Sequence, residues 1–430
     1  MKSHTLESTV DLSCIRSLTV FGECNSFFIS KKMRMLRVLD LEDTYGLRDP
    51  DLSSIGKLYH LRYLSLRGSI GIFCLPDSLG NLSNLETLDV RGTMVTKLPS
   101  TIVKLQKLKY LRAGIIAWNE DDNSKQMITA LMQYLFMVFK ICFRKETEYD
   151  AMEEAWVPLV CLIITVWLKG LDPHGVKVPK GIGRLRSFHT LGIVNVARRK
   201  TTLKAIQELT QLHKLGITGI NTNNCKDLEL AISNQRHLKS LSMRAQGEIG
   251  LKGCLDNMTP PEQLESLKLY GSLEKLPRWF GKLHGLVKLT LRSTLLKQGS
   301  VELLGKLQNL ASLRLWDKSF KGEALQFQRG FENLMVLEIG GLCDVKSVKF
   351  EAPAMPKLKL LKIECWWDTE ICSFTGLDLL SSLEEVLLSG LSEEDLQESD
   401  LDSEEQLVHR AVKEEILKQI EKKAELKMGH

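Results

Sequence analysis

The sequence predicts an α/β solenoid, a chain of stacked strand-and-turn units that share one elongated core. Three observations predict it. A pattern Leu-x-x-Leu-x-Leu returns fourteen times, its copies usually follow one another after 22 to 26 residues, and a second apolar pattern recurs in phase between them. A period of roughly 20 to 29 residues with this spacing is the leucine-rich-repeat signature. Because each unit packs only on its neighbours, 430 residues can extend as one array.

The copies of the leucine pattern define strands. Clear copies begin at Leu36, Leu61, Leu85, Leu108, Leu212, Leu238, Leu264, Leu286, Leu310, Leu334 and Leu358, and looser ones at Ile15, Phe188 and Leu383. Leu64 and Leu66 are two residues apart, so they point to the same side of a strand, and Tyr63, Ser65 and Arg67 point to the other. Stacked neighbours bury a ladder of leucines. We therefore expect a curved leucine-rich-repeat solenoid with a parallel sheet on the concave face.

The return segments between strands carry the second pattern. It begins at Leu75-Pro76, Leu98-Pro99, Val178-Pro179 and Leu276-Pro277. Apolar residues at spacing three follow each proline, and a Gly usually stands beside one of them. Proline suits a turn or a first helical position, and the spacing makes one inward stripe. We expect short helical or 3₁₀ segments on the convex side.

The register predicts the domain organisation. Between Leu108 and Phe188 the period fails for 80 residues. We expect an N-terminal repeat block at 1–114, an irregular apolar insertion at 115–177, a C-terminal repeat block at 178–390, and an acidic linker with an amphipathic helix at 391–430.

Two apolar runs stand in the insertion. The first, at 127–143, reaches 17 residues only by including Gln133 and Lys140, and the second, at 155–168, has 14 residues and contains Pro158. A membrane span needs about 20 apolar residues. Three interpretations stay open: a packed helical insertion, sequence that was not selected for this fold, and a membrane hairpin. We expect no membrane association.

Charge and cysteine usage indicate partners and compartment. The net charge is +5, and residues 391–430 carry 12 acidic against 6 basic residues, so the rest of the chain carries +11. A basic array favours acidic partners. The ten cysteines include no Cys-x-x-Cys pair and no spacing typical of a metal site or a disulfide framework. The N-terminus has no apolar segment typical of a secretory signal. We expect reduced thiols in a cytoplasmic protein.

Several long strings resemble one family. They are MRMLRVLDLEDT at 33–44, the run from LPDSLGNLSNLETLDV to LKYLRAG at 75–114, and VPKGIGRLRSFHTLG at 178–192. They resemble the leucine-rich-repeat region of plant intracellular immune receptors, the nucleotide-binding leucine-rich-repeat class with an N-terminal coiled coil. The string LSCIRSLTVFGE at 12–23 is similar to the strand that opens that region. The resemblance implies recognition of pathogen effectors, directly or through guarded host proteins, and restraint of an attached switch domain.

The sequence departs from such receptors at one point. Receptors of this class carry a P-loop before the repeats, and this chain has no Gly-x-x-x-x-Gly-Lys-Ser/Thr. Each Gly-Lys pair, at Gly56, Gly281 and Gly305, is followed by Leu inside a repeat. Nucleotide switching is therefore not carried over to this chain, and we expect no cofactor. The chain is interpreted as the sensor part: a truncated receptor, a decoy or an adaptor.

Catalysis and metal binding find no support in the motifs. There is no Gly-x-Ser-x-Gly and no His-Glu-x-x-His. The histidines, such as His189 and His213, recur at a similar repeat phase, which indicates repeat-position substitutions rather than ligands. Cys365 and Cys372 are interpreted as core or cap residues. We expect neither an enzyme nor a metal site.

The exposed strand positions are the candidate partner-binding residues. They are Tyr63, Arg67, Arg91, Tyr110, Arg112, Arg244, Lys268, Tyr270, Lys288, Arg292, Arg314 and Trp316. Because residues of equal phase stack across the sheet, we expect a basic stripe edged with aromatic residues on the concave face. Arg and aromatic residues dominate interface hot spots. Acidic residues such as Asp40 and Glu338 interrupt the stripe, so nucleic acid is not expected.

The function expected is that of a protein-recognition array in plant defence. It would sense pathogen effectors or guarded host proteins and pair with a nucleotide-binding receptor module. The partner is a protein, with no small-molecule substrate. A leucine-rich-repeat adaptor of a ubiquitin ligase is the alternative from another class, but the roughly 14 residues before Ile15 are too few for an F-box. A non-functional receptor fragment is the third interpretation.

Overall fold

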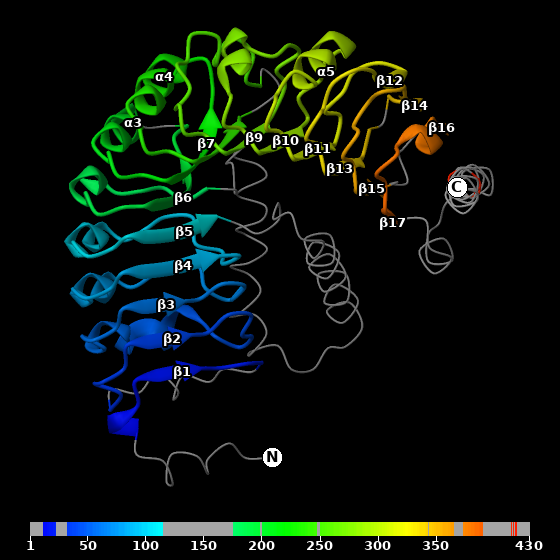
Figure 1. Cartoon of the computed structure of the whole chain (residues 1–430). Coiled ribbons are helices and arrows are strands. Elements are labelled where there is room, and N and C mark those ends of the chain that lie inside the picture. The colour runs from blue at the N-terminus through cyan, green and yellow to red at the C-terminus, as the bar shows by residue number, and fades with distance from the viewer. Residues whose placement is uncertain are drawn as a thin grey trace, which may run out of the picture. The chain divides into compact units, whose positions relative to one another are not determined.

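The computed structural model describes residues 12–22, 32–114, 175–197, 200–246, 250–342, 344–364 and 373–389, together with 414, 416 and 418. The chain falls into two units, Met1–Gly219 and Ile220–His430. Both units have the same construction, which is a parallel sheet on one side of a leucine core and short helical segments on the other (Figure 1).

In the first unit, the strands pair in parallel in chain order (Figure 1). They are β1 Ser17–Thr19, β2 Val38–Asp40, β3 Tyr63–Ser65, β4 Thr87–Arg91, β5 Tyr110–Gly114, β6 Thr190–Asn195 and β7 Lys214–Ile220, the last of which ends at the unit boundary. Tyr63 is paired with Thr87, and Thr87 with Tyr110. Residues of equal repeat phase therefore stand in columns across the strands, as the spacing predicts.

The interruption of the repeat leaves the sheet continuous. β5 pairs directly with β6, with Tyr110 beside Thr190 and Leu111 beside Leu191. On the other side of the core, Leu98 N donates to Lys177 O at 3.0 Å. The two repeats that flank the interruption therefore stack as immediate neighbours. The predicted insertion itself lies outside the described residues, apart from residues 175–177.

The return segments of the first unit are mostly 3₁₀ helices. They are η2 Leu12–Cys14, η4 Asp49–Lys57, η5 Asp77–Asn81, η6 Ser100–Lys104 and η7 Ile182–Arg184, followed by the α-helix α3 Lys200–Gln207. Pro76 and Pro99 precede η5 and η6 at the N-cap with φ of −69° and −63°. The predicted helical or 3₁₀ segments are confirmed. Proline ends the preceding extended stretch and sets the direction of the turn.

The core is the ladder of leucines that the repeat predicts. Leu64, Leu88 and Leu111 enter it from the strands, and Leu79 and Ile102 from the return segments; all are at most 1% exposed. Of the predicted pattern starts, every one from Leu36 to Leu383 is buried, and Ile15 is half-buried. The expectation of an α/β leucine-rich-repeat solenoid with a parallel sheet is therefore confirmed.

The second unit repeats this plan. Its main strands are β8 Ser240–Ala245, β9 Ser266–Tyr270, β10 Lys288–Arg292, β11 Ser312–Trp316, β13 Val336–Gly340, β15 Leu360–Glu364 and β17 Glu385–Ser389. Its helical segments are α4 Cys225–Ser233, η8 Arg278–Lys282, α5 Gln298–Leu304 and η9 Leu377–Leu379. All described pairings between the main strands are parallel.

A second, smaller sheet stands in the return segments of the last repeats. It consists of β12 Ala324–Phe327, β14 Ser347–Phe350 and β16 Ser373–Thr375, all parallel. The Gln298 side chain closes the edge of β12: its Nε2 donates to Gln326 O at 2.7 Å, and its Oε1 accepts from Gln326 N at 3.1 Å. This side-chain amide takes the place of a neighbouring strand. The repeat spacing gives no signal for this sheet.

Buried hydroxyl groups satisfy backbone carbonyls just after the strands. Thr44, Ser69, Thr93 and Thr294 are at most 3% exposed. Thr44 Oγ1 donates to Leu41 O at 2.9 Å, and Thr93 Oγ1 to Val90 O at 2.7 Å. Thr294 Oγ1 donates to Ser319 O in the next repeat at 2.9 Å. A buried carbonyl left unpaired costs free energy, so these hydroxyls stabilise the turn that leaves the strand.

The cysteines differ from the expectation at one pair. Cys225, the first residue of α4, and Cys254, in the loop after β8, form a disulfide with their Cα atoms 4.8 Å apart. The expectation of reduced thiols throughout is wrong for this pair. Their sequence separation of 29 hides their proximity, because the solenoid brings residues one repeat apart to neighbouring positions. Cys14 and Cys74 are exposed and free.

Other expectations concern residues that lie mainly outside the described part of the chain. Among the described residues, no helix is long and apolar enough to cross a membrane. The apolar runs at 127–143 and 155–168 and the pair Cys365 and Cys372 are not among them. In the C-terminal segment, Ile416 is helical and buried, whereas Glu414 and Lys418 are exposed.

The core ladder makes a direct prediction. Leu313→Ala removes a fully buried side chain of β11 and leaves a cavity, so we expect a loss of about 2 to 5 kcal/mol in unfolding free energy. Leu303→Ala, in α5, alters a leucine that is 49% exposed and should cost under about 0.5 kcal/mol. Urea unfolding followed by circular dichroism measures both. Equal losses of unfolding free energy in the two variants would contradict the conclusion that burial of the leucine ladder stabilises the fold.

Candidate functional site

The residues that point away from the leucine core form the strand face, which the sequence predicts as the binding surface. In the second unit, Lys268 stands beside Thr290, and Thr290 beside Arg314. The next column places Tyr270 beside Arg292, and Arg292 beside Trp316. The structure therefore confirms that the candidate residues stack in columns within each unit. What each column can bind depends on the partners of its charges.

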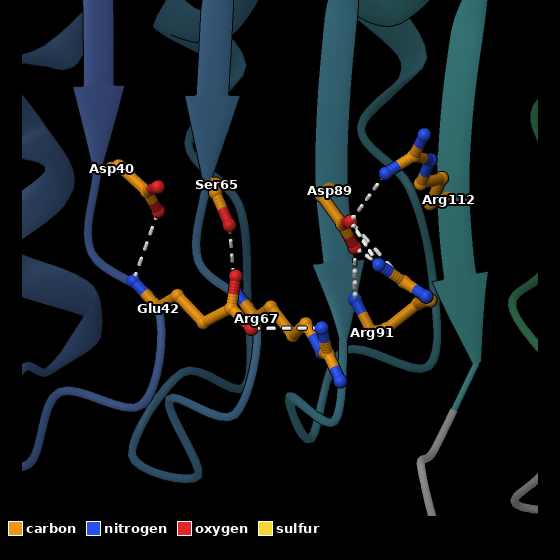
Figure 2. Close-up of polar contacts among 7 residues, drawn as sticks. All are labelled: Asp40, Glu42, Ser65, Arg67, Asp89, Arg91 and Arg112. Atoms are coloured by element: carbon orange, nitrogen blue, oxygen red, sulfur yellow. Dashed lines mark hydrogen bonds and ion pairs between the residues drawn. The ribbon is translucent and has the colours of Figure 1, made fainter. Parts of the chain in front are cut away.

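In the first unit, a buried carboxylate holds two of the candidate arginines (Figure 2). Asp89, in the middle of β4, has a side chain that is 2% exposed. Arg91 donates to it through Nε at 2.9 Å and through Nη2 at 2.6 Å, a two-pronged contact. Arg112 on β5 places Nη1 3.6 Å from Asp89 Oδ2. This hydrogen-bonded contact raises the pKa of the Arg91 guanidinium, so Arg91 stays charged and fixed.

A second ion pair stands beside this cluster (Figure 2). Arg67 Nη1 lies 2.8 Å from Glu42 Oε1, one repeat earlier. Around them, burial raises the pKa of the Tyr63 phenol, and the carboxylates of Asp40 and Asp89 act in the same direction. The phenol of Tyr63 therefore stays neutral. The three candidate arginines of this unit, Arg67, Arg91 and Arg112, therefore each pair with an acidic residue.

Polar side chains end the strands of the first unit. Asp40 Oδ1 accepts a hydrogen bond from Glu42 N, and Asp89 Oδ1 accepts one from Arg91 N, both at 3.2 Å. Ser65 Oγ accepts from Arg67 N at 3.4 Å. Asp and Ser favour such local bonds to the backbone two residues on, which turn the chain. Asp89 therefore both ends its strand and pairs with the arginines.

Tyr110 begins a ring cluster at the start of its strand. Tyr110 is exposed, and its ring centroid lies 5.9 Å from that of His189, which stacks on His213 at 5.1 Å. Burial lowers the pKa of the His189 imidazole, and the charges of His213 and Lys109 lower it further. The histidines in equal phase are therefore neighbours in space, but two of them stacked on an edge do not form a metal site.

In the second unit, cations and aromatic rings alternate along one column. Arg244 lies over Tyr270, with Cζ 4.2 Å from the ring centroid. Tyr270 is buried, at 8% exposed, so the expectation of an exposed side chain at this position is wrong. Arg292 follows, then Trp316. The side chain of Arg292 is 15% exposed and pairs with Asp317 in the turn after β11. Burial lowers the pKa of the Arg292 guanidinium, against the attraction of Asp317. We call Arg244, Tyr270, Arg292 and Trp316 the cation–aromatic column.

Lysines stand beside this column. Lys288, at the start of β10, is exposed, and Lys268 is half-buried. Arg314 Nε pairs with Glu338 Oε2 at 2.9 Å. Lys362 Nζ lies 3.8 Å from Glu364 Oε1.

The charge of the strand face differs between the two units. In the first unit, Arg67, Arg91 and Arg112 are matched by Asp40, Glu42 and Asp89. In the second unit, six basic residues on the face stand against four acidic ones: Glu338, Glu364, Glu385 and the adjacent Asp317. The predicted basic stripe therefore keeps an excess of positive charge in the second unit, and is electrically neutral over β1 to β5.

Sequence reasoning missed the partners of the arginines. It treated the acidic residues as interruptions of a stripe, whereas Asp89 and Glu42 are the residues that fix Arg91, Arg112 and Arg67. Asp317 stands outside the leucine pattern, so the repeat spacing gives no signal for it. A signal for the first two is present in the sequence: Asp89 stands two positions before Arg91, and Glu42 stands one repeat before Arg67 at the same phase.

No group of three or more His, Cys, Asp or Glu side chains among the described residues could hold a metal ion. The arrangement of the strand face can form ion pairs, hydrogen bonds and ring contacts, which is the chemistry of protein recognition.

Comparison with known proteins decides the family. The model of a family described as "Leucine-rich repeat region" matches residues 14–133 and 157–416. The chain belongs to this family. The match overlaps most of both predicted repeat blocks and also parts of the predicted insertion at 115–177.

The relatives of the chain include plant disease resistance proteins. Disease resistance protein Pik-2 of Oryza sativa subsp. japonica is 27% identical over 414 residues, which cover 88% of this chain and 37% of that protein. Disease resistance protein RPM1 of Arabidopsis thaliana is 26% identical over 219 residues, covering 51% of this chain and 23% of that protein. The resemblance to these proteins is confirmed. The chain spans about a third of the length of the relatives it matches most extensively.

Among solved structures, a leucine-rich-repeat protein of Leptospira interrogans aligns with a TM-score of 0.45 and 16% identity, covering 89% of this chain and 87% of that one. The ectodomain of the Arabidopsis receptor kinase HAESA, solved in complex with a peptide hormone ligand, aligns with a TM-score of 0.36 and 14% identity, covering 86% and 64%.

The Asp89 cluster predicts a specific loss of stability. Asp89→Ala leaves the half-buried Arg91 without its two-pronged partner and the Arg91 N–H without an acceptor, so we expect a cost of about 2 to 3 kcal/mol. Asp40→Ala, which removes a single 3.2 Å bond at a half-buried site, should cost about 1 kcal/mol or less. Denaturant unfolding of both variants tests the difference. Equal costs would mean that the arginines do not depend on Asp89.

The ring stack predicts a pH dependence. The pKa of His189 is lower in the folded chain than the unfolded value of about 6.5, so the folded state binds fewer protons and stability falls as the pH drops below about 6.5. His189→Gln should flatten the loss of unfolding free energy between about pH 7.5 and pH 5. The variant His60→Gln, at an exposed histidine of another repeat, is the control. An unchanged pH profile for His189→Gln would refute the assignment.

Proposed function

We propose that this chain is a protein-recognition array of plant defence, which senses pathogen effectors or guarded host proteins and pairs with a nucleotide-binding receptor module. The array would act in the cytoplasm, as the receptors it resembles do. The observation that carries the proposal is the cation–aromatic column of the second unit, on a scaffold whose relatives are disease resistance proteins.

The composition of the column supports a protein partner. Arg, Tyr and Trp are the residue types most enriched in interface hot spots, because they combine large contact area with directed polar groups. Arg292 is already ordered by Asp317 and by the strands on either side. A side chain held in place before binding loses little conformational entropy when a partner docks. The column is therefore suited to anchor a partner.

The charge of the second unit supports an acidic partner. The strand face of this unit has six basic residues against four acidic ones, and Lys268 and Lys288 stand in the two columns that precede the cation–aromatic column. Complementary charge steers association and selects against wrong partners. The strand face over β1 to β5 is neutral, so the candidates there, Tyr63 and Tyr110 among them, would contribute shape and hydrogen bonding rather than net charge.

The proposal predicts the effect of charge reversal on the strand face. The variant Lys268→Glu with Lys288→Glu should weaken association with a nucleotide-binding module, supplied as a separate polypeptide, at least about tenfold, because attraction becomes repulsion. Co-immunoprecipitation after co-expression in leaf tissue measures it, with the cell-death response as a second readout.

The matched control is Lys282→Glu with Lys306→Glu. Both lysines are exposed in the same unit, stand outside the strands and give the same change in net charge. This control should associate within about twofold of the unaltered chain. The proposal is lost if the unaltered chain does not associate with any module of this receptor class, or if the control loses as much as the strand-face variant.

A further inference from the structure

One edge of the first unit carries a concentration of positive charge that the strand face does not explain. In each repeat, six residues connect the end of the return segment to the start of the strand. In the first unit these segments are 32–37, 57–62, 81–86, 104–109 and 184–189, and together we call them the basic rim. They contain ten Lys and Arg residues and one acidic residue, Glu86, which gives a net charge of +9.

The concentration is confined to these repeats. The next segment, 208–213, has Glu208 and neither Lys nor Arg. The seven equivalent segments of the second unit, from 234–239 to 379–384, contain six basic and four acidic residues, a net charge of +2. The leucine framework is the same in both units, so the repeat itself does not require the excess.

The five segments are neighbours in space as well as in phase. Arg62 N donates to Arg37 O at 2.8 Å, Glu86 N to Arg62 O at 2.8 Å, and Lys109 N to Glu86 O at 2.9 Å. His189 N continues the series to Lys109 O at 2.8 Å. With neighbouring strands about 4.8 Å apart, the five segments form a strip roughly 20 Å long. The basic residues therefore lie along one strip of adjacent backbone segments.

The charges of the rim point into solvent. Nine of the ten basic residues are exposed, and the tenth, Lys109, is half-buried. Glu86 lies between two of them, with Lys109 Nζ at 3.0 Å and Arg62 Nη1 at 4.0 Å. The hydrogen bond from Lys109 lowers the pKa of Glu86, so this carboxylate is ionised and balances a single positive charge. The net charge of the five rim segments together is +9.

Two large, partly exposed hydrophobic side chains, one of them an amphipathic tyrosine, stand among the charges. Tyr59 is 56% exposed and Met35 is 39% exposed, each within a rim segment. Both are flanked by basic residues: Lys57 and Arg62 in one segment, Arg34 and Arg37 in the other. Amphipathic tyrosine beside long basic side chains is the composition of a surface that rests at the lipid headgroup level.

We propose that the basic rim binds the surface of an anionic phospholipid bilayer. Clusters of four to eight Lys and Arg are typical of peripheral binding to anionic lipids, and each contributes roughly a fivefold increase in affinity close to the surface. The contact is peripheral and independent of the open question about the two apolar runs, and it departs from the sequence-based expectation of no membrane association. It also leaves the strand face free, since the rim residues precede the strands.

The composition of the rim favours a bilayer over other polyanions. The cores of protein interfaces are depleted in Lys, whereas Lys supplies five of the ten charges here. A nucleic-acid site combines phosphate contacts with an element that enters a groove or with aromatic rings on which bases stack. In the described rim segments, Tyr59 is the one exposed tyrosine, and the charges are spread over a strip rather than along a groove. A fluid anionic surface needs no such directed contacts.

Vesicle sedimentation tests the proposal. The full chain is mixed with vesicles of phosphatidylcholine alone and with vesicles that contain about 30% phosphatidylserine, at about 0.1 M salt. We expect binding to the second kind only, lost at about 1 M salt, where the Debye length falls to about 3 Å. The variant Arg34→Glu, Lys57→Glu, Arg186→Glu should bind at least about 100-fold more weakly.

The control reverses three exposed charges of the same kind in the second unit: Arg236→Glu, Lys282→Glu, Lys306→Glu. It has the same net charge as the rim variant and should bind within about threefold of the unaltered chain. Circular dichroism shows whether both variants are folded. The proposal is overturned if both variants lose binding equally, if neutral vesicles bind as well as anionic ones, or if the rim captures an oligonucleotide but no vesicle.

Discussion

The stacking of parallel strands at a fixed register is the constraint on which the rest of this structure depends. Backbone hydrogen bonds hold each repeat one strand from the next, as when Arg62 N donates to Arg37 O at 2.8 Å. Because the register is fixed, leucines of equal phase meet in one core, and other residues of equal phase meet in columns. Shifting one strand by a single residue would turn its leucines to solvent. The ion pairs, the cation–aromatic column and the basic rim all follow from it.

The same register explains why the strand face over β1 to β5 has arginines without an excess of positive charge. The columns bring residues of adjacent repeats together whether their charges are alike or opposite. Asp89 is buried in the middle of β4 and tolerable there because Arg91 and Arg112 approach it. Arg91 and Arg112 therefore serve to stabilise the buried Asp89 within the sheet. Positive charge that can reach a partner stands elsewhere, beside the cation–aromatic column and along the basic rim.

The sequence predicted the fold far better than the candidate site. The leucine period identifies strands, core and return segments, because burial of Leu64 or Leu88 is a requirement of each repeat. The exposed residues obey no such requirement, so their period shows where they stand but not what they contact. The pairing of Arg292 with Asp317, and the disulfide of Cys225 with Cys254, depend on turns of unequal length. The leucine spacing likewise does not predict the three strands of the small second sheet, where the Gln298 side chain hydrogen-bonds to the edge of β12 in place of a neighbouring strand.

Division of labour within each repeat has a consequence for how such an array can change over generations. A strand of five residues offers two or three outward positions, and the register arranges these positions in rows along the strands and columns across them. Substitution at Lys288 or Trp316 alters one of these positions, while the buried leucines keep the other positions in place. Specificity can therefore be revised point by point, and the cost in folding is incurred only where a residue such as Asp89 belongs to both surface and scaffold.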